Sequence, residues 1–117
     1  MGVGYFVCPD HLRGNWQSVV EQSCGVTSLL DNRSLRDRCA AYPDLTFPEQ
    51  TNPEESSDGV FFRRGSYQVR VGCTFTDLIQ RYTFDFTYNR SEGNVVLARD
   101  IWAALQNAGA NERFPDE

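Results

Sequence analysis

The sequence predicts an α+β fold in which an N-terminal helix packs on a four- to five-stranded antiparallel sheet and a C-terminal helix closes the chain. An early segment has helical periodicity, the middle alternates apolar and polar residues as half-buried strands do, and the end returns to helical spacing. Four cysteines in a short chain predict that disulfide bonds stabilise this fold. The length of 117 residues suits one domain spanning residues 1–117.

The first helix is predicted over residues 16–24. Asn15 is a favourable N-cap, and Gly25 is a favourable C-terminal stop. A second, shorter helix is predicted to begin at Ser34 and to end before Pro43. The side chains that recur at helical spacing in the first helix are Trp16, Val19, Val20, Ser23 and Cys24.

Residues 43–58 are predicted to form a solvated acidic loop. This segment contains three prolines, five acidic residues and no basic residue. It therefore carries the whole formal charge of -5, because elsewhere eleven acidic residues balance eleven arginines. A broad basic surface is not expected, although arginines can still cluster locally.

Antiparallel strands are predicted after the acidic loop. Residues 59–63 and 66–71 alternate around a turn at Arg64-Gly65. The most regular strand is Arg81–Tyr88, with Tyr82, Phe84, Phe86 and Tyr88 on one face and Arg81, Thr83, Asp85 and Thr87 on the other. We expect its aromatic face to pack on the first helix, which leaves its polar face toward solvent or a ligand.

The last part of the chain is predicted to form one more strand and then a helix. The turn residues Asn89–Gly93 lead into a partner strand at Asn94–Ala98. Asp100 then caps a helix that ends at Gly109. The tail Ala110–Glu117 is expected to fray.

The cysteines predict secretion, because oxidising compartments let thiols pair. Among the three possible pairings of Cys8, Cys24, Cys39 and Cys73, we favour Cys24 with Cys39, which would tie two helices, and Cys8 with Cys73, which would anchor the N-terminus to the sheet. A zinc site is disfavoured because no C-x-x-C pair occurs. The sequons at Asn32 and Asn89 fit glycosylation on a secretory route, with the export leader already removed. The sequence contains no run of about 20 apolar residues, so it predicts no membrane span.

Candidate binding residues lie on the polar face of the predicted sheet. Arginine forks pair well with phosphate or carboxylate, and a sheet would hold them in place. The alternative is a solvated face whose arginine and aspartate side chains pair with each other. The common hydrolase, nucleotide and metalloprotease motifs are missing from the sequence, so we assign no catalytic residue, metal or cofactor. The candidates are Gln68, Arg70, Arg81, Thr83 and Asp85.

Several short motifs occur in a fixed order between residues 5 and 98. They are Tyr5-x-x-Cys8, a valine-containing helix that ends near Cys24, Tyr42-Pro43, Tyr67-Gln68-Val69-Arg70-Val71, and Arg81 at the start of an apolar strand. This order resembles the small guanyl-specific fungal ribonucleases. It is also similar to the ribonuclease-like effectors that plant-pathogenic fungi secrete.

The resemblance implies a ribonuclease-like fold without the enzyme. That family uses a glutamate base on a strand, an arginine on the next strand, and histidines that include the general acid. Gln68 stands at the glutamate position, Arg81 at the arginine position, and Asp44 at a histidine position. A neutral amide cannot accept the proton of a 2′-hydroxyl as a carboxylate can. The implied function is a secreted, monomeric virulence effector that binds a host protein or nucleic acid.

The absence of lysine is explained most simply by a GC-rich coding sequence that favours arginine. Alternatively, lysine is avoided because its amine is the target of ubiquitination, which would matter for a protein delivered into a host cell.

Three other functions remain open from the residues. Gly14-Asn15-Trp16 resembles the G-x-W of lipocalin-like barrels, which carry small ligands, although the helical periodicity leaves too few residues for eight strands. An extracellular structural or interaction module without a pocket would share the cysteines and sequons. A residual enzyme would use Asp85 or Asp77 with Arg81.

Overall fold

The computed structural model describes residues 4–51, 53 and 57–113, without the side chains of residues 57 and 58. This part of the chain forms six strands, four α-helices and one 3-10 helix, which confirms the α+β class. In chain order the elements are β1 (Tyr5–Val7), the 3-10 helix η1 (Asp10–Leu12), α1 (Trp16–Cys24), β2 (Thr27–Leu30), α2 (Leu35–Ala41), α3 (Pro48–Thr51), β3 (Ser57–Arg64), β4 (Tyr67–Thr76), β5 (Arg81–Thr87), α4 (Glu92–Asn107) and β6 (Asn111–Arg113).

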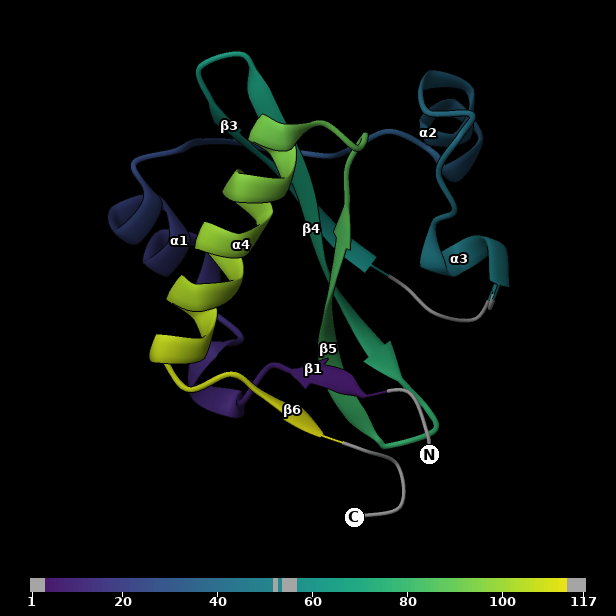
Figure 1. Ribbon diagram of the computed structural model, residues 1–117. Coiled ribbons are helices and arrows are strands. Elements are labelled where there is room, and N and C mark those ends of the chain that lie inside the picture. The colour runs from purple at the N-terminus through teal and green to yellow at the C-terminus, as the bar shows by residue number, and fades with distance from the viewer. Residues whose placement is uncertain (1–3, 52, 54–56, 114–117) are drawn as a thin grey trace.

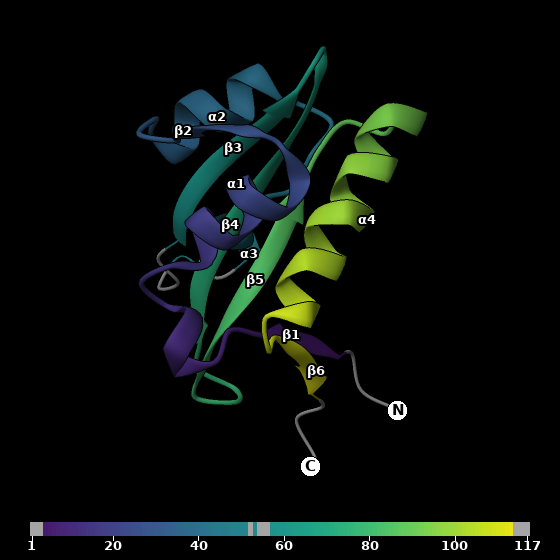
Figure 2. The same cartoon turned by 90° about the vertical axis from the view of Figure 1, so that its left-hand side faces the viewer.

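The six strands form one antiparallel sheet in the order β2-β3-β4-β5-β1-β6. Helices α1 and α4 lie on one side of this sheet, and α2 and α3 lie on the other (Figure 1). Figure 2, seen from the α1 side, shows α2 and α3 behind the strands. We call the side under α1 and α4 the core face and the side under α2 and α3 the second face. The sheet is therefore covered on both faces.

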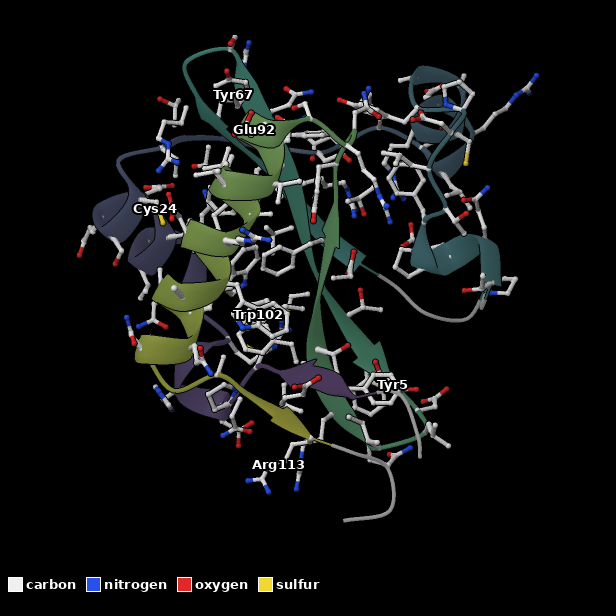
Figure 3. The ribbon with its side chains drawn as sticks, in the orientation of Figure 1. Tyr5, Cys24, Tyr67, Glu92, Trp102 and Arg113 are labelled. Carbon is white, nitrogen blue, oxygen red and sulfur yellow. The ribbon has the colours of Figure 1, made fainter. Side chains whose placement is uncertain are left out.

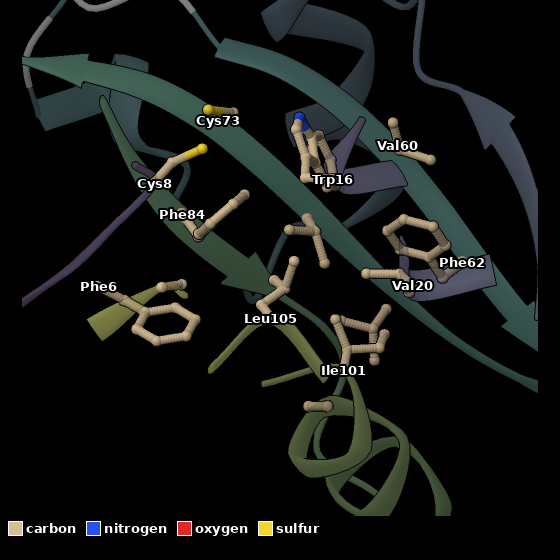
Figure 4. Packing of buried hydrophobic residues seen from close by; sticks show 14 of the residues in the cluster. Phe6, Cys8, Trp16, Val20, Val60, Phe62, Cys73, Phe84, Ile101 and Leu105 are labelled. Atoms are coloured by element: carbon tan, nitrogen blue, oxygen red, sulfur yellow. The ribbon is translucent and has the colours of Figure 1, made fainter. Parts of the chain in front are cut away.

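The core face holds the main hydrophobic cluster, in which aromatic rings meet edge to face (Figure 4). The ring of Trp16 lies 5.4 Å from the ring of Phe84 and 5.9 Å from that of Phe62, centroid to centroid. This contact confirms that the first helix packs on the aromatic stripe of β5. Farther along the stripe, Phe86 contacts Trp102 of α4 instead, with centroids 5.8 Å apart. Both α1 and α4 therefore cover the aromatic face of β5, which α1 alone was expected to cover.

Several predicted ends and turns are confirmed. Gly25 ends α1 in the left-handed conformation, with φ of 61°. The Ser34 hydroxyl caps α2 by accepting the N–H of Asp37. The turn between β3 and β4 places Gly65 at φ of 66°, a region that favours glycine. Asn15 precedes α1, but its side chain makes no capping hydrogen bond.

The predicted strand Asn94–Ala98 is wrong, because these residues belong to α4. The Ser91 hydroxyl accepts the N–H of Asn94 and starts the helix there, nine residues before Asp100. Leu97, Ile101 and Leu105 then follow at a spacing of four, and all three are fully buried. The apolar run at residues 95–98 is compatible with either a strand or a helix, and only the longer helical repeat favours the helix.

Three short strands were not predicted. The tail expected to fray instead forms β6, where Glu112 pairs with Phe6 of β1. Residues 114–117, the rest of that tail, lie outside the described residues. On the opposite edge, β2 pairs with β3 through Leu30 and Val60. Segments of three or four residues carry little periodicity, so their pairing depends on the strands that they meet.

The acidic loop at residues 43–58 is only partly solvated. Phe47 within it is fully buried, and its N–H donates to the Gln50 side chain at 2.6 Å. The short helix α3 follows directly. Of the five acids, Glu54 and Glu55 lie outside the described residues, as does the side chain of Asp58. Phe47 anchors the loop to the sheet because packing there removes its apolar ring from water.

The predicted disulfides are absent from the structure, since all four cysteines are described and none is bonded to another. Cys24 at the end of α1 and Cys39 in α2 lie on opposite faces of the sheet (Figure 1). Their predicted pairing is therefore wrong. No helix of the described residues is both long and apolar enough to cross a bilayer.

The packing of the core face predicts that removing a buried aromatic ring strongly lowers the free energy of unfolding. Phe62→Ala is expected to lower the free energy of unfolding by about 3–5 kcal/mol, because Phe62 is fully buried against Trp16. Leu78→Ala, at a side chain 69% exposed, should change it by less than about 0.5 kcal/mol. Urea unfolding followed by tryptophan fluorescence measures both. Equal losses in the two variants would contradict this description of the core.

Candidate functional site

Arg70 lies at the centre of the second face and is almost wholly buried. It sits on β4, and its side chain is 1% exposed. Its Nε donates to Asp31 Oδ2 at 2.8 Å, and its Nη1 lies 3.5 Å from Asp85 Oδ2. The guanidinium lies across β3 at Gly59, where any Cβ would collide with it. Gly59 is therefore needed for this close approach of side chain to strand.

A second buried arginine, Arg38 of α2, continues the pairing. Its Nη2 donates to Glu49 Oε2 at 2.5 Å, and its Nε lies 3.8 Å from Asp31 Oδ2. The Phe47 ring lies under both guanidinium groups, 5.0 Å from Arg38 Cζ and 5.6 Å from Arg70 Cζ. We call the whole set the arginine–carboxylate cluster: Asp31, Arg33, Arg38, Glu49, Arg70 and Asp85.

The two carboxylates beside Arg70 differ in their electrostatics. Burial alone would raise the pKa of Asp31, but hydrogen bonds from Arg70 and Arg33 outweigh it and hold that pKa below its ordinary value. Burial raises the pKa of Asp85, and the Thr74 hydroxyl and Arg70 offset this only in part. The cluster has three arginines and three acids, so its formal charge cancels.

The five binding residues expected from the sequence do not form one surface. Gln68 donates to the Tyr42 hydroxyl at 2.5 Å near the start of β4. Arg70 and Asp85 pair inside the cluster, and buried Thr83 bonds Thr76, with hydroxyl oxygens 2.8 Å apart. Arg81 is exposed at the far end of β5. The polar face that was expected to meet solvent or a ligand is therefore largely covered, because α2, α3 and Phe47 lie over it.

Two of the positions that the ribonuclease resemblance implied, Gln68 and Arg81, do not meet. Arg81 pairs with Thr76 at the end of β4, whereas Gln68 lies at its start. Thr76 lies eight positions after Gln68 along the strand, roughly 26 Å at about 3.3 Å per residue. One phosphate could not contact both Gln68 and Arg81.

An open groove runs between the edge of the sheet and the segment that leads into α2. Its volume is about 680 Å³. The rings of Tyr42 and Phe61 stack in it with centroids 6.1 Å apart, and the Arg33 guanidinium lies 5.0 Å from the Phe61 ring. We call this the edge groove, and its lining includes Leu29, Leu30, Asn32, Arg33, Asp37, Tyr42, Phe61, Arg63 and Gln68.

The strand beside this groove, β2, has an open edge. It ends the sheet, and Leu29 and Leu30 are 53% and 66% exposed. Asp31 donates its N–H to Gly59 of β3 at 3.0 Å. Because backbone groups alternate along an antiparallel strand, those of Leu30 and Ser28 point away from β3. Two N–H donors and two C=O acceptors therefore face the open side.

A second hollow lies between β5 and α4. Its volume is about 510 Å³, and its walls are mainly apolar. The Trp102 indole, 36% exposed, stacks on the Phe6 ring with centroids 3.7 Å apart. Among the described residues of this lining, Arg99 alone is charged. We call it the helix groove, lined by Phe84, Phe86, Tyr88, Ala98, Arg99 and Trp102. Figure 3 shows Trp102 on the side of α4 that faces β5.

Both sequon asparagines are exposed. Asn32 lines the edge groove, so a glycan on it would stand at that groove. Asn89 lies between β5 and α4, where its C=O accepts from Asn94 Nδ2 at 2.7 Å.

Sequence reasoning missed most of the residues that form these sites. Asp31 and Arg38 were not singled out, and Glu49 was placed in the solvated acidic loop, although ion pairs join all three. One available signal was Phe47, a lone aromatic in an acidic stretch, which predicts a local anchor. The edge groove has no comparable signal, because its walls come from β2, β3 and α2.

The cluster predicts that Arg70 cannot be replaced singly. Arg70→Met is expected to lower the free energy of unfolding by about 3–5 kcal/mol, because the carboxylates of Asp31 and Asp85 lose their shared cation. Arg81→Met is the matched control and should cost less than about 0.5 kcal/mol, since Arg81 is exposed. Urea unfolding at pH 7 measures both. A cost for Arg70→Met no larger than the control's would refute the structural role of the cluster.

Comparison with known proteins identifies no relative of this chain. No family model, no curated protein and no solved structure matches it. The function must therefore be inferred from the geometry of the two grooves and the cluster.

Proposed function

We propose that this protein is a secreted, non-catalytic binding domain that recognises an extended segment of a partner protein at the open edge of β2. The observation that carries the proposal is the exposed pair Leu29 and Leu30 on that edge, directly beside the edge groove. Secretion rests on the four cysteines and the two sequons. The absence of catalysis rests on the charges of the second face, which pair with each other.

Strand addition fits this edge because the main chain of β2 can form hydrogen bonds with the main chain of a partner segment. An added strand would pair with the outward N–H and C=O groups of Ser28 and Leu30. Its alternate side chains would enter the edge groove, where the stacked Tyr42 and Phe61 rings offer an apolar wall. Natural proteins usually protect such edges with charged residues or proline. Two exposed leucines instead favour a surface that a partner covers.

The charges of the groove favour an acidic partner segment. Arg33 is already bonded to Asp31 at 3.3 Å. Among the described side chains, Arg63 takes part in no ion pair. A carboxylate two residues from an apolar anchor would reach Arg63 on the same face of the added strand. The preferred segment is therefore extended, with apolar and acidic residues alternating.

A protein partner is favoured over a nucleic acid by charge. Nucleic-acid binding depends on several arginines or lysines that neutralise phosphates. The edge groove has two arginines, one of them paired, together with the acidic Asp37, and the whole chain carries -5. This charge would oppose a polyanion and would not hinder a short peptide with one or two carboxylates.

The proposal predicts binding that depends on the backbone of β2. Peptides selected from a phage library of random 12-mers should contain alternating apolar and acidic residues and shift the amide NMR signals of Ser28 and Leu30. Leu30→Pro should weaken their binding at least about tenfold, because it removes one outward N–H and its side chain, whereas Leu30→Ala should weaken it less. Arg63→Glu should weaken binding by about 10–100-fold.

The same experiment can overturn the proposal. Equal affinity of the Leu30→Pro and Leu30→Ala variants, with both folded by circular dichroism, would exclude strand addition. Selected peptides that shift only amides far from β2 would place binding elsewhere. A single-stranded RNA 12-mer that binds more tightly than every peptide would replace the protein partner with a nucleic acid.

A second candidate function, a carrier of a small anionic amphiphile, is favoured by the helix groove. The lipocalin-like barrel expected for such a carrier is wrong, because residues 16–24 form a helix and not a strand. The helix groove nevertheless has the size of a ligand site, an apolar wall and Arg99 to meet a carboxylate.

Trp102 makes this second candidate testable by fluorescence. Oleate should quench or shift the Trp102 emission, and the signal should vanish in Trp102→Phe, because Trp16 is buried in the core. Arg99→Glu should weaken binding about tenfold, whereas Arg113→Glu on β6 should leave it unchanged. An equal effect of the two charge reversals, or no response to oleate, would exclude the carrier function.

A further inference from the structure

Two buried cysteines lie side by side where β1 ends. Cys8 follows β1 directly, and its N–H donates to the Tyr82 C=O of β5 at 2.9 Å. Cys73 lies on β4, opposite Phe84 of β5. The residues are 4% and 1% exposed. Their sulfur atoms point toward one another (Figure 4), and the Cys8 thiol donates to the Pro9 C=O at 3.6 Å.

We propose that Cys8 and Cys73 form a disulfide bond when the protein folds in an oxidising compartment. In the sheet β5 lies between β4 and β1, so forming the bond requires the end of β1 to move toward β4. A disulfide brings its sulfurs to about 2.05 Å. Its formation would bring together two sulfurs that already point toward one another (Figure 4). The bond would tie the N-terminal strand to the centre of the sheet.

The structure assigns this one bridge and no second. Cys24 and Cys39 are separated by the sheet, with α1 on the core face and α2 on the second face (Figure 1). Cys8 and Cys73 both belong to the buried cluster of the core face. Within one folded chain, Cys39 therefore cannot reach any of the other three sulfurs without crossing the sheet.

Arg13 distinguishes the two sulfurs chemically. Its Nη1 donates to Cys73 Sγ at 3.2 Å, and its guanidinium carbon lies 3.6 Å from the centre of the Tyr82 ring. A guanidinium beside sulfur stabilises the thiolate, so Cys73 is the better nucleophile. The hydrogen bond to Cys73, followed by burial, raises the pKa of the Cys8 thiol, which therefore keeps its proton.

The oxidation can be written with glutathione disulfide as the oxidant. The Cys73 thiolate attacks one sulfur of glutathione disulfide, the S–S bond breaks, and one glutathione thiolate leaves. That thiolate takes the Cys8 proton. Cys8 sulfur then attacks Cys73 Sγ and displaces the second glutathione. Two protein thiols are oxidised and one glutathione disulfide is reduced. Because both sulfurs are buried, the exchange takes place before the core closes or during a local opening.

Trypsin provides a direct test, because the arginines place each cysteine in a separate peptide: residues 1–13, 14–33, 39–63 and 71–81. The protein is refolded in reduced and oxidised glutathione, alkylated, digested without reductant and analysed by mass spectrometry. We expect a cross-linked pair of peptides 1–13 and 71–81, with Cys24 and Cys39 alkylated. The melting temperature should fall by roughly 10–20 °C when reductant is added, since the bridge closes a long loop.

Serine variants separate the bridge from its alternatives. Cys8→Ser should lose the cross-link and the effect of reductant on the melting temperature. Cys39→Ser, the matched control, should keep both. If Cys8→Ser does not refold, the wild-type digest and its melting with and without reductant still decide the question. A folded protein with all four cysteines alkylated, or a cross-link between peptides 14–33 and 39–63, would overturn the proposal.

Discussion

The second face of the sheet depends on one buried cation, the guanidinium of Arg70. A charge that is 1% exposed must be paired, and its two carboxylates come from different places: Asp31 follows β2, and Asp85 lies on β5. Pairing with Asp31 brings the segment after β2 back over the sheet. Arg38 and Glu49 extend the same pairing into α2 and α3, with Phe47 packed beneath. The cover of this face thus follows from the need to satisfy Arg70.

This arrangement decides where binding can occur. The centre of the second face offers no net charge, because its arginines and acids already pair with one another. The recognition that we propose is therefore assigned to the margins of the sheet, where the edge groove and the helix groove open. The same cluster shapes the edge groove, since Arg33 bonds Asp31 while its guanidinium lies against Phe61. Arg33 therefore belongs both to the ion pair with Asp31 and to the wall of the edge groove.

The two faces are held by different forces. The core face packs α1 and α4 through apolar contacts, which are strong but non-directional. The second face uses hydrogen-bonded charges, whose desolvation offsets much of their attraction. Such pairs contribute less to net stability than to geometry, because the ion pairs fix where α2 and α3 lie although Arg38 Nε, Arg38 Nη1 and Glu49 Oε1 make no hydrogen bond within the described part of the chain.

The sequence by itself determined the α+β class, the helix α1, the strands β3 to β5, and local signals such as Gly25 and Ser34. These follow from periodicity and capping, which act over a few residues. Tertiary structure alone decided β1, β2 and β6, which are too short to have a period of their own. It also decided that residues 94–98 join α4. The site was predicted only at Gln68, Arg70 and Asp85, because the other partners lie far away along the chain: Arg70 meets Asp31 across 39 residues. Contacts between segments so far apart depend on the order of strands in the sheet, and local patterns do not encode that order.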